Sequence, residues 1–278
     1  MTVSPASTFS AQTLIEELHL PEGCRVDQRV PKKLLLENVA STAADKRLIN
    51  EFIEEIQWVA TLKPNTIGVP DYRDAQREYL EIVVLAVTLR GVVKNASLSR
   101  IAELAHRAVP YPVLMVLVHG HELTLSLAHK RWAQNEADKV VLDDSLVKVT
   151  MSASQLAVNS KFSNYPDPAA VVKAESAFIC SLSIALQPRV SLQALYQGWI
   201  NCLEALQAAR LTGNFLLPAD IEQVFARRQA LTDYQRLEAE VCRLRAQAAK
   251  EKQLARQVEL NLTLKRVQAE LAAALRQL

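Results

Sequence analysis

The strongest constraint on this fold is an apolar stripe that changes sides along the last forty residues. Between Leu237 and Leu262, apolar residues recur at steps of three, four and seven, which keeps one face of a helix apolar. A second set runs from Leu260 to Leu278, and at about 100° per residue Leu260 lies roughly 140° around the axis from Leu237. A helix that packs only on its own domain needs one stripe. Two stripes in series predict two packing surfaces and point toward assembly with another chain.

We expect residues 218–278 to form one long amphipathic helix of the coiled-coil type. Its first stripe follows directly from the preceding helices, so Leu237, Val241 and Leu244 are expected to pack within the chain. The second stripe lies about 30–60 Å further along a continuous helix, beyond reach of the same core. Residues 257–264 also alternate with the period of a strand, but their helix-forming flanks favour a helix. The residues predicted to bind another chain are Leu264, Val267, Leu271 and Leu278.

The composition favours helix and gives no sign of a membrane protein. Half of the 278 residues are hydrophobic and only 5% are aromatic, and Ala and Leu dominate. The four cysteines lie far apart without a CxxC pair, which is typical of reduced, mostly buried thiols. The N-terminus lacks the pattern of a signal peptide, and no apolar run approaches the roughly 20 residues that cross a bilayer. We therefore expect a cytoplasmic protein with no membrane partner.

The pattern of apolar residues predicts an α+β fold. Residues 28–150 are expected to form a mostly antiparallel sheet with two helices on it, after an N-terminal segment over 1–27. The helices are predicted at 42–62 and 97–108, and the strands at 66–69, 79–89, 113–118, 123–128, 140–142 and 146–149. The last four strands are expected to pair as two hairpins. A helical pair over 151–217 then leads to the long helix over 218–278.

The sequence contains none of the common catalytic motifs. The P-loop, the dinucleotide-binding glycine fingerprint, HExxH and GxSxG are all missing, and six glycines leave little room for a phosphate-binding loop. His119 and His121 flank Gly120 in a predicted hairpin turn, where both rings are expected to face solvent. Two exposed histidines rarely form a ligand set, so we expect no metal and no cofactor.

One hypothesis is a divergent metal-dependent nuclease. Such an enzyme needs strand carboxylates to hold a divalent cation and a nearby lysine to stabilise charge at the phosphate. Glu81 lies on a strand with the pattern of a central strand, and Glu78 precedes it by three residues. However, Ile82 and Val83 follow Glu81 where a Glu-x-Lys motif would be expected. The sequence therefore favours a protein without catalytic activity over this hypothesis.

Three basic segments are candidates for contact with nucleic acid. The first two contain Arg29, Lys32 and Lys33, and, at the end of a strand, Lys130, Arg131 and Trp132. Residues 243–266 carry seven basic and two acidic side chains, a net charge of +5, and the contact candidates there are Arg245, Lys252 and Arg256. Cations beside an aromatic ring suit phosphate and a stacked base, in DNA or RNA. The alternative is that Trp132 caps the edge of the core while the charges are solvated.

Several short segments occur in an order and spacing that resembles one bacterial family. They are RVPKK at 29–33, Lys46, IEEIQW at 53–58, LKPNTI at 62–67, Glu81-Ile82 with the strand to Leu89, VPYP at 109–112, LSLAHKR at 125–131, KEKQ at 250–253 and VELN at 258–261. The family is catalogued as domain of unknown function 4391. Ala255 stands where the family pattern favours asparagine. The resemblance implies a companion of Swi/Snf-type helicases and DNA methyltransferases in restriction and phage-defence clusters, and it supplies no catalytic residue.

We therefore predict a non-catalytic interaction or scaffold subunit of a bacterial DNA-targeting defence system. Its expected partners are a helicase or methyltransferase subunit, a second copy of the chain, or both. The alternative is a nucleic-acid-binding subunit that uses the three basic segments. The sequence leaves open the identity of the partner and the oligomeric state.

Overall fold

The computed structural model describes residues 10–39, 42–134, 140–143, 146–152 and 166–278. The chain divides into two compact units, each built from two segments. Unit 1 consists of Met1–Asn159 and Ala177–Leu203, and unit 2 consists of Ser160–Ser176 and Glu204–Leu278. The main sheet belongs to unit 1, whereas the described part of unit 2 is helical. The predicted α+β fold is therefore confirmed.

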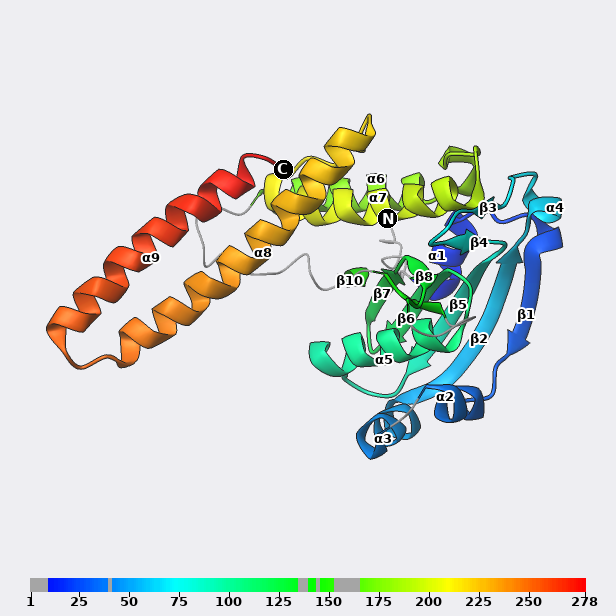
Figure 1. The fold of residues 1–278 in the computed structure, drawn as a ribbon, viewed down its shortest axis with the longest axis horizontal. Helices are drawn as coiled ribbons and strands as arrows, with labels where there is room; N and C mark the ends of the chain where they lie inside the picture. The colour runs from blue at the N-terminus through cyan, green and yellow to red at the C-terminus, as the bar shows by residue number, and fades with distance from the viewer. Residues whose placement is uncertain (1–9, 40–41, 135–139, 144–145, 153–165) are drawn as a thin grey trace, which may run out of the picture. The chain divides into compact units, whose positions relative to one another are not determined.

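A six-stranded sheet forms the centre of unit 1, in the order β1-β2-β5-β6-β7-β10 (Figure 1). Its strands are β1 (Arg25–Arg29), β2 (Ile53–Leu62), β5 (Ile82–Leu89), β6 (Val113–His119), β7 (Glu122–Leu127) and β10 (Val147–Ser152). Neighbouring strands run antiparallel except β5 and β6, which are parallel. Helix α5 (Asn95–Ala108) connects this parallel pair, because parallel neighbours need a crossover connection.

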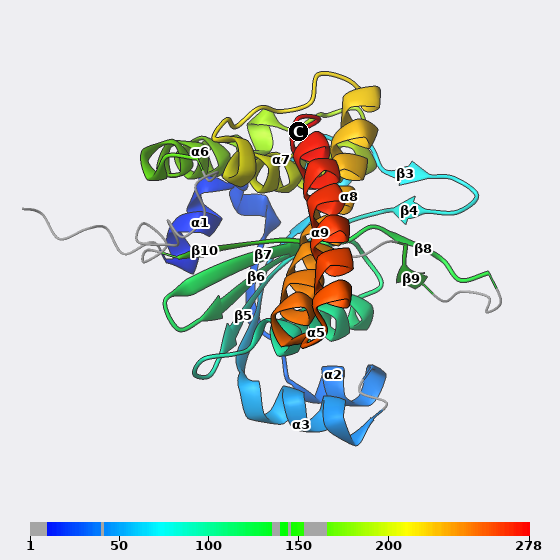
Figure 2. The ribbon, with the colours of Figure 1, turned by 90° about the vertical axis from the view of Figure 1, so that its left-hand side faces the viewer.

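Two short ribbons and several short helices accompany this sheet. One ribbon pairs β3 (Tyr72–Arg73) with β4 (Glu78–Tyr79), and the other pairs β8 (Lys130–Trp132) with β9 (Val140–Leu142). Figure 2 shows the ribbons next to each other, and a backbone hydrogen bond of 2.8 Å from Trp132 to Gln76 joins them. The short helical elements of unit 1 are α1 (Ala11–Glu17), η1 (Glu22–Cys24), α2 (Lys33–Asn38), α3 (Ala43–Phe52), α4 (Pro64–Ile67) and η3 (Ile184–Leu186).

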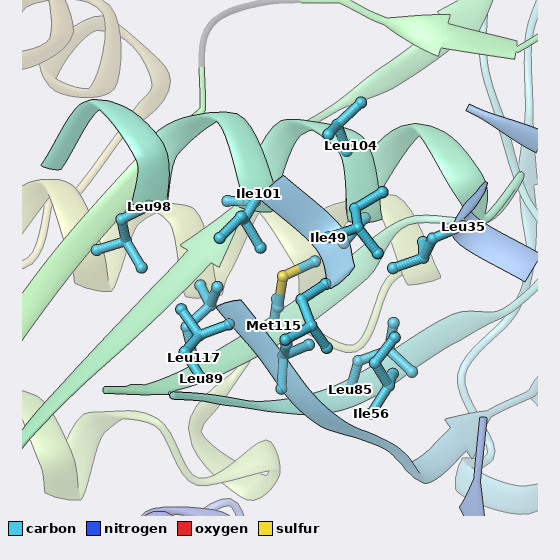
Figure 3. Packing of buried hydrophobic residues seen from close by; sticks show 14 of the residues in the cluster. Leu35, Ile49, Ile56, Leu85, Leu89, Leu98, Ile101, Leu104, Met115 and Leu117 are labelled. Atoms are coloured by element: carbon cyan, nitrogen blue, oxygen red, sulfur yellow. The ribbon is translucent and has the colours of Figure 1, made fainter. Parts of the chain in front are cut away.

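The largest hydrophobic core of unit 1 lies between α5 and the sheet. In Figure 3, Leu98 and Ile101 of α5 point toward Met115 and Leu117 of β6. Strand β5 is buried along nearly its whole length, in agreement with its continuous run of apolar residues. Burying one such side chain contributes about 1.5–3 kcal/mol, so this cluster fixes α5 on the sheet.

The predicted helix over 42–62 is wrong in its second half. Helix α3 ends at Phe52, and Ile53–Leu62 form strand β2 between β1 and β5. The register of β2 against β5 shifts at two places. Each shift inserts a residue and interrupts the alternation of a regular strand. The buried side chains of Ile53, Ile56 and Val59 are therefore three residues apart, a spacing that mimics a helix.

Other predicted strands also differ from the structure. The strand predicted at 66–69 is helix α4, which ends at Gly68 with a φ of 64°. The second predicted hairpin is wrong, because β9 pairs with β8 while β10 pairs with β7. The strand predicted at 79–89 is divided into β4 and β5. The helix predicted at 97–108 and the hairpin predicted over 113–128 are confirmed as α5 and as β6 with β7.

The helices after the sheet include a hairpin that the sequence did not predict. Helices α6 (Pro168–Ser181) and α7 (Leu192–Thr212) confirm the predicted helical pair, and both pass from one unit into the other. Helices α8 (Ile221–Lys250) and α9 (Leu254–Leu275) run antiparallel in unit 2 (Figure 1). The continuous helix predicted over 218–278 is therefore wrong. The chain reverses at 251–253, where the Glu251 carboxylate accepts backbone hydrogen bonds from Lys252 at 2.8 Å and Gln253 at 2.9 Å.

This reversal places the second apolar stripe against the first. The core of the hairpin consists of Leu237, Val241, Leu244, Val267 and Ala274, with Tyr234, Leu260, Leu264 and Leu271 packed against it. The expectation that Leu264, Val267 and Leu271 lie beyond reach of the chain's own core is therefore wrong. Leu278 follows α9 and is partly buried. Contact of these residues with another chain stays a prediction.

Every helix in the described part of the chain is too short or too polar to cross a lipid bilayer.

Candidate interaction site

Lys130 is buried rather than available to a phosphate. The residue is only 3% exposed. Its ammonium donates a hydrogen bond of 2.7 Å to the backbone oxygen of His106 and further hydrogen bonds to the backbone oxygens of Val109 and Tyr111. The carbonyls at the end of a helix lack donors within the helix and carry partial negative charge. Burial lowers the pKa of Lys130 to about 7. The expected surface position of Lys130 is wrong, because the side chain anchors the end of α5.

His129, next to Lys130, belongs to a buried polar cluster. Its Nδ1 contacts the Tyr79 hydroxyl, and its Nε2 lies 2.8 Å from Oε1 of Gln197 on α7. The rings of Tyr79, His129 and Tyr196 lie 5.7–6.1 Å apart. Burial raises the pKa of both tyrosines, which keeps them neutral. The sequence did not indicate this cluster, because its members are distant along the chain and form no motif.

Arg131 and Trp132 are engaged with neighbouring parts of unit 1. Nε of Arg131 lies 3.0 Å from Oδ1 of Asp143, and Arg77 binds the other oxygen of the same carboxylate. Both arginine side chains are about one-third exposed, at 33% and 32%. Trp132 is partly buried. This segment is therefore mainly structural, although part of each side chain reaches the surface.

The first basic segment is partly on the surface. Arg29 on β1 is exposed and forms an ion pair of 3.5 Å with the exposed Glu55, a contact that contributes little to stability. Lys32 turns inward and donates a hydrogen bond to the backbone oxygen of Ile53. Lys33 is exposed. Two of the three predicted contact residues are therefore accessible to a ligand.

The carboxylates of the nuclease hypothesis are occupied by cations. Glu81 pairs with Lys63 at 3.2 Å, and Glu78 pairs with Arg73. Within the ranges that the structure describes, no group of three His, Cys, Asp or Glu side chains is placed to hold a metal ion. Among the described residues, Glu81 therefore has no further side chains beside it that could complete a metal site for a nuclease.

One of the two hairpin histidines differs from its predicted position. His121 is exposed, as expected, but His119 is 5% exposed and its Nε2 lies 2.9 Å from Oγ1 of Thr124. Burial lowers the pKa of His119, which favours the neutral ring. The expectation that both rings face solvent is therefore wrong for His119, because its ring bonds across the hairpin.

A depression beside α5 has a volume of about 580 Å³, and its lining includes Arg100, Glu103 and Lys148 together with Leu142 and Leu146. Arg100 binds both carboxylate oxygens of Asp45 at 2.9 Å and also binds Glu103 at 2.8 Å. This contact holds the pKa of Asp45 below its ordinary value. Because two carboxylates surround the guanidinium, Arg100 itself offers little attraction for an anion.

Helix α9 has a second apolar face that α8 does not cover. Leu254, Val258 and Leu262 are 76%, 50% and 63% exposed. They are four residues apart and therefore lie within roughly 80° around the helix, in what we call the outer row. The sequence places Val258 and Leu262 in the first stripe. Because the chain reverses, that stripe continues on the side of α9 that faces away from α8. The apolar face of α9 that is exposed to solvent is therefore the outer row, whereas Leu264 packs against the hairpin core.

The turn of the hairpin is basic. Lys250, Lys252 and Arg256 are exposed around it, and Arg245 is exposed further back on α8. Arg256 lies 3.7 Å from Glu251, at a side-chain exposure of 70%, where solvent weakens the attraction. The predicted contact residues of this segment, Arg245, Lys252 and Arg256, therefore lie on the surface. Their contact with nucleic acid stays a prediction.

A groove runs along α8 and α9, and Leu211 of α7 also lines it. Its volume is about 310 Å³, and its apolar lining includes Tyr234, Val241, Leu271 and Leu275. Glu238 and Arg245 of α8 contribute charged groups, and Cys242 and Ala272 contribute small side chains. Cys242 and Cys180 are exposed, so only two of the four cysteines, Cys24 and Cys202, have the predicted burial. The groove and the outer row are both apolar surfaces of unit 2.

Comparison with known proteins gives one match. The model of the family described as Domain of unknown function (DUF4391) matches residues 18–271, which is most of the chain. No curated protein and no solved structure matches.

Proposed function

Since the chain belongs to the family Domain of unknown function (DUF4391), we propose from its structure that it is an interaction subunit that joins other protein chains through its α8–α9 hairpin. The outer row is the observation that carries this proposal. A hairpin with its own core does not need three further apolar side chains at 50–76% exposure on the opposite face of α9. Exposed apolar rows of this kind are typical of helices that dock on a partner.

The free energy gained by burying the outer row is large enough for a specific contact with a partner. Burial of each Leu or Val side chain contributes about 1.5–3 kcal/mol. Association costs part of this gain, because two chains lose their independent motion. The three apolar side chains of the outer row can therefore form the centre of an interface, and further contacts around them would complete it.

The proposed setting is a DNA-targeting defence system in the bacterial cytoplasm. Under this proposal the chain assembles with a Swi/Snf-type helicase or a DNA methyltransferase. The support for this setting is the sequence resemblance, which implies a companion of such enzymes. The chain itself has the role of a scaffold and not of a catalyst.

The test is co-purification of the full chain with the neighbouring helicase or methyltransferase, together with its mass in solution. We expect wild type to form a complex or a homo-oligomer. Val258→Asp should abolish this assembly, because an aspartate without an opposite charge beside it is costly to bury in an interface. Ala246→Asp is the matched control, since it adds the same charge at an exposed position of α8 outside the groove. A wild-type monomer that captures no protein would contradict the proposal.

A second candidate function is binding of nucleic acid by the turn of the hairpin. It rests on Lys250, Lys252 and Arg256, which are exposed together around a reversal of the chain. Phosphate contacts release counterions, so the logarithm of the affinity should fall with the logarithm of salt by about 0.9 per contact on duplex DNA. Anisotropy titrations measure this slope. Charge reversal at Lys252 and Arg256 should flatten it, whereas reversal at Arg29 and Lys33 tests the sheet surface. No binding at low salt would remove the candidate.

A further inference from the structure

Cations from distant parts of the chain meet where strand β2 begins. Lys32, which follows β1, donates a hydrogen bond to the backbone oxygen of Ile53. Arg90, which follows β5, donates its backbone N–H to the neighbouring backbone oxygen of Phe52 at 2.7 Å. Strands β1 and β5 flank β2 on its two sides, so their ends bring both basic residues to the junction of α3 and β2. No motif in the sequence indicates this cluster, because its members are far apart along the chain.

The positive charges of this cluster repel one another. Burial and, second, the charges of Arg90 and Arg29 lower the pKa of Lys32, whereas the charge of Glu54 acts in the opposite direction. Arg29, the last residue of β1, is exposed, and its ion pair of 3.5 Å with the exposed Glu55 is weakened by solvent. Three cations therefore lie near two carboxylates. Like charges held close together cost free energy, which contact with an anionic ligand would offset.

The loop from β5 to α5 extends this basic surface. Its two ends, Arg90 and Lys94, are exposed, and neither forms an ion pair among the residues that the structure describes. The first turn of α5 contains no acidic residue that could neutralise Lys94. Val93 is 6% exposed and packs in the core of unit 1, whereas Val92 beside it is 94% exposed. The core therefore anchors the loop, and its charges stay accessible to a ligand.

We propose that this end of unit 1 binds the phosphate backbone of nucleic acid through Arg29, Lys33, Arg90 and Lys94. All four side chains are exposed. Lys33 begins α2, which lies beside α3 in Figure 2, and its ion pair of 3.4 Å with Glu37 is also exposed. A polyanion fits this surface, because its cations lie on a strand, a helix and a loop. Such contacts position nucleic acid without reading its sequence. The inference goes beyond the proposed function, since it concerns unit 1 and not the α8–α9 hairpin.

The first experiment measures binding of the full chain to a short labelled DNA duplex by fluorescence anisotropy. Arg90→Gln combined with Lys94→Gln should weaken binding at low salt by about tenfold or more. The slope of log affinity against log salt should fall by about 1.8, at about 0.9 for each lost phosphate contact. Lys252→Gln combined with Arg256→Gln, at the hairpin turn, should leave this part of the slope in place. Wild-type affinity in the Arg90 and Lys94 variant would overturn the inference.

Val92 allows a second test that leaves every native cation in place. Because its side chain is 94% exposed, substitutions there should not affect folding. Val92→Glu should weaken DNA binding by about threefold, and Val92→Lys should strengthen it by a similar factor. Val190→Glu is the matched control, since Val190 is 82% exposed in unit 1 and the adjacent Arg189 binds the backbone oxygen of Ile67, beyond the other end of β2. Equal effects of Val92→Glu and Val190→Glu would assign binding to overall charge and overturn the inference.

Failure of this inference is distinguishable from failure of the proposed function. A chain that captures a helicase in a Val258-dependent manner but does not bind duplex DNA at low salt overturns only the inference. If the Arg90 and Lys94 variant loses a protein partner and keeps its affinity for DNA, the basic surface is a protein interface, which also overturns the inference. Inorganic phosphate should displace no more DNA than chloride does at equal ionic strength. Stronger displacement by phosphate would indicate a site for a single anion and would contradict the binding of a polyanion.

Discussion

Lys130 contacts backbone groups of unit 1 that are 19 to 24 residues away along the chain. Its ammonium reaches the last turn of α5 and the segment that leads into β6, where backbone oxygens lack other helical donors. A basic residue in the sequence HKRW looks solvent-exposed, because its neighbours are polar. The position of three carbonyls around it depends on tertiary packing and has no local signal. The exposed cations near the hairpin turn were predictable because they lie in a segment rich in charged residues.

Replacement of Lys130 by Met should destabilise unit 1. The variant keeps most of the apolar stem but removes every donor, which leaves buried carbonyl oxygens without partners at a cost of about 1–3 kcal/mol for each group. We expect a loss of about 3 kcal/mol, measured by urea unfolding with tryptophan fluorescence. Lys33→Met, at an exposed position, should change the free energy of unfolding by less than about 0.5 kcal/mol. Equal midpoints for the two variants would show that Lys130 is not an anchor.

His106 should make the stability of unit 1 depend on pH. Burial and, second, the charge of Lys130 lower the pKa of His106 from 6.5 to about 3. The unfolded chain then binds a proton more readily than the folded chain between these values, so stability is present above pH 6.5 and falls as the pH drops. We expect this group to account for a loss of about 2 kcal/mol between roughly pH 7.5 and pH 5.

The measurement for His106 compares urea unfolding at the two pH values. His106→Gln keeps a polar group near Ser126, whose Oγ lies 3.1 Å from Nε2 of His106. This variant should lose about 2 kcal/mol less on acidification than wild type, whereas His121→Gln should behave as wild type, since His121 is exposed. An unchanged pH dependence in His106→Gln would assign the effect to other groups.

Elements with uninterrupted periodicity could be predicted, and those with interruptions could not. Helix α5 and the β6–β7 hairpin show regular spacing and clear breaks, at Pro110 and Gly120. Strand β2 has two register shifts, and its buried residues acquire a helical spacing as a result. In such a case local periodicity gives the wrong element, and only pairing with β1 and β5 decides the structure.

The α8–α9 hairpin shows a different limit of sequence reasoning. A stripe that changes sides fits a continuous helix with two partners and also a helix that folds back on itself. The turn at 251–253 contains neither Gly nor Pro, so the usual breaking residues are missing. What stops α8 is the extended backbone of Glu251, with a ψ of 130°, and the hydrogen bonds to its carboxylate. The exposed apolar face of α9 is therefore the outer row, whereas Leu264, Val267 and Leu271 pack in or against the hairpin core.

Two leucines of α9 should respond to the same substitution by very different amounts. Leu271 packs against the hairpin core, whereas Leu262 is 63% exposed. Leu271→Asp should lower the free energy of unfolding of unit 2 by about 2–4 kcal/mol, and Leu262→Asp by less than about 0.5 kcal/mol. Thermal melts followed by circular dichroism in dilute solution measure this, because dilution removes the contribution of assembly. If Leu262→Asp is the more destabilising variant, the outer row is part of a core.

At the scale of the whole molecule, the two units differ in the optical signals they carry. Trp58, Trp132 and Trp199 all belong to unit 1. Unit 2 contains α8 and α9, which have 30 and 22 residues and provide a large part of the helical signal. Tryptophan fluorescence therefore reports on unit 1, whereas circular dichroism reports on the helices of both units. This separation allows the independence of the two units to be measured on the intact chain.

Leu244→Asp should unfold unit 2 before unit 1. Leu244 is 3% exposed in the hairpin core, and a buried charge without a partner is costly, so we expect a loss of about 3 kcal/mol or more in unit 2. In urea titrations the part of the circular dichroism signal that comes from unit 2 should be lost at lower urea, while the transition in tryptophan fluorescence stays near that of wild type. The matched variant Leu104→Asp, in the core of unit 1, should move the fluorescence transition instead. If both probes shift together in Leu244→Asp, the two units unfold as one cooperative body, through α7, which passes from one to the other.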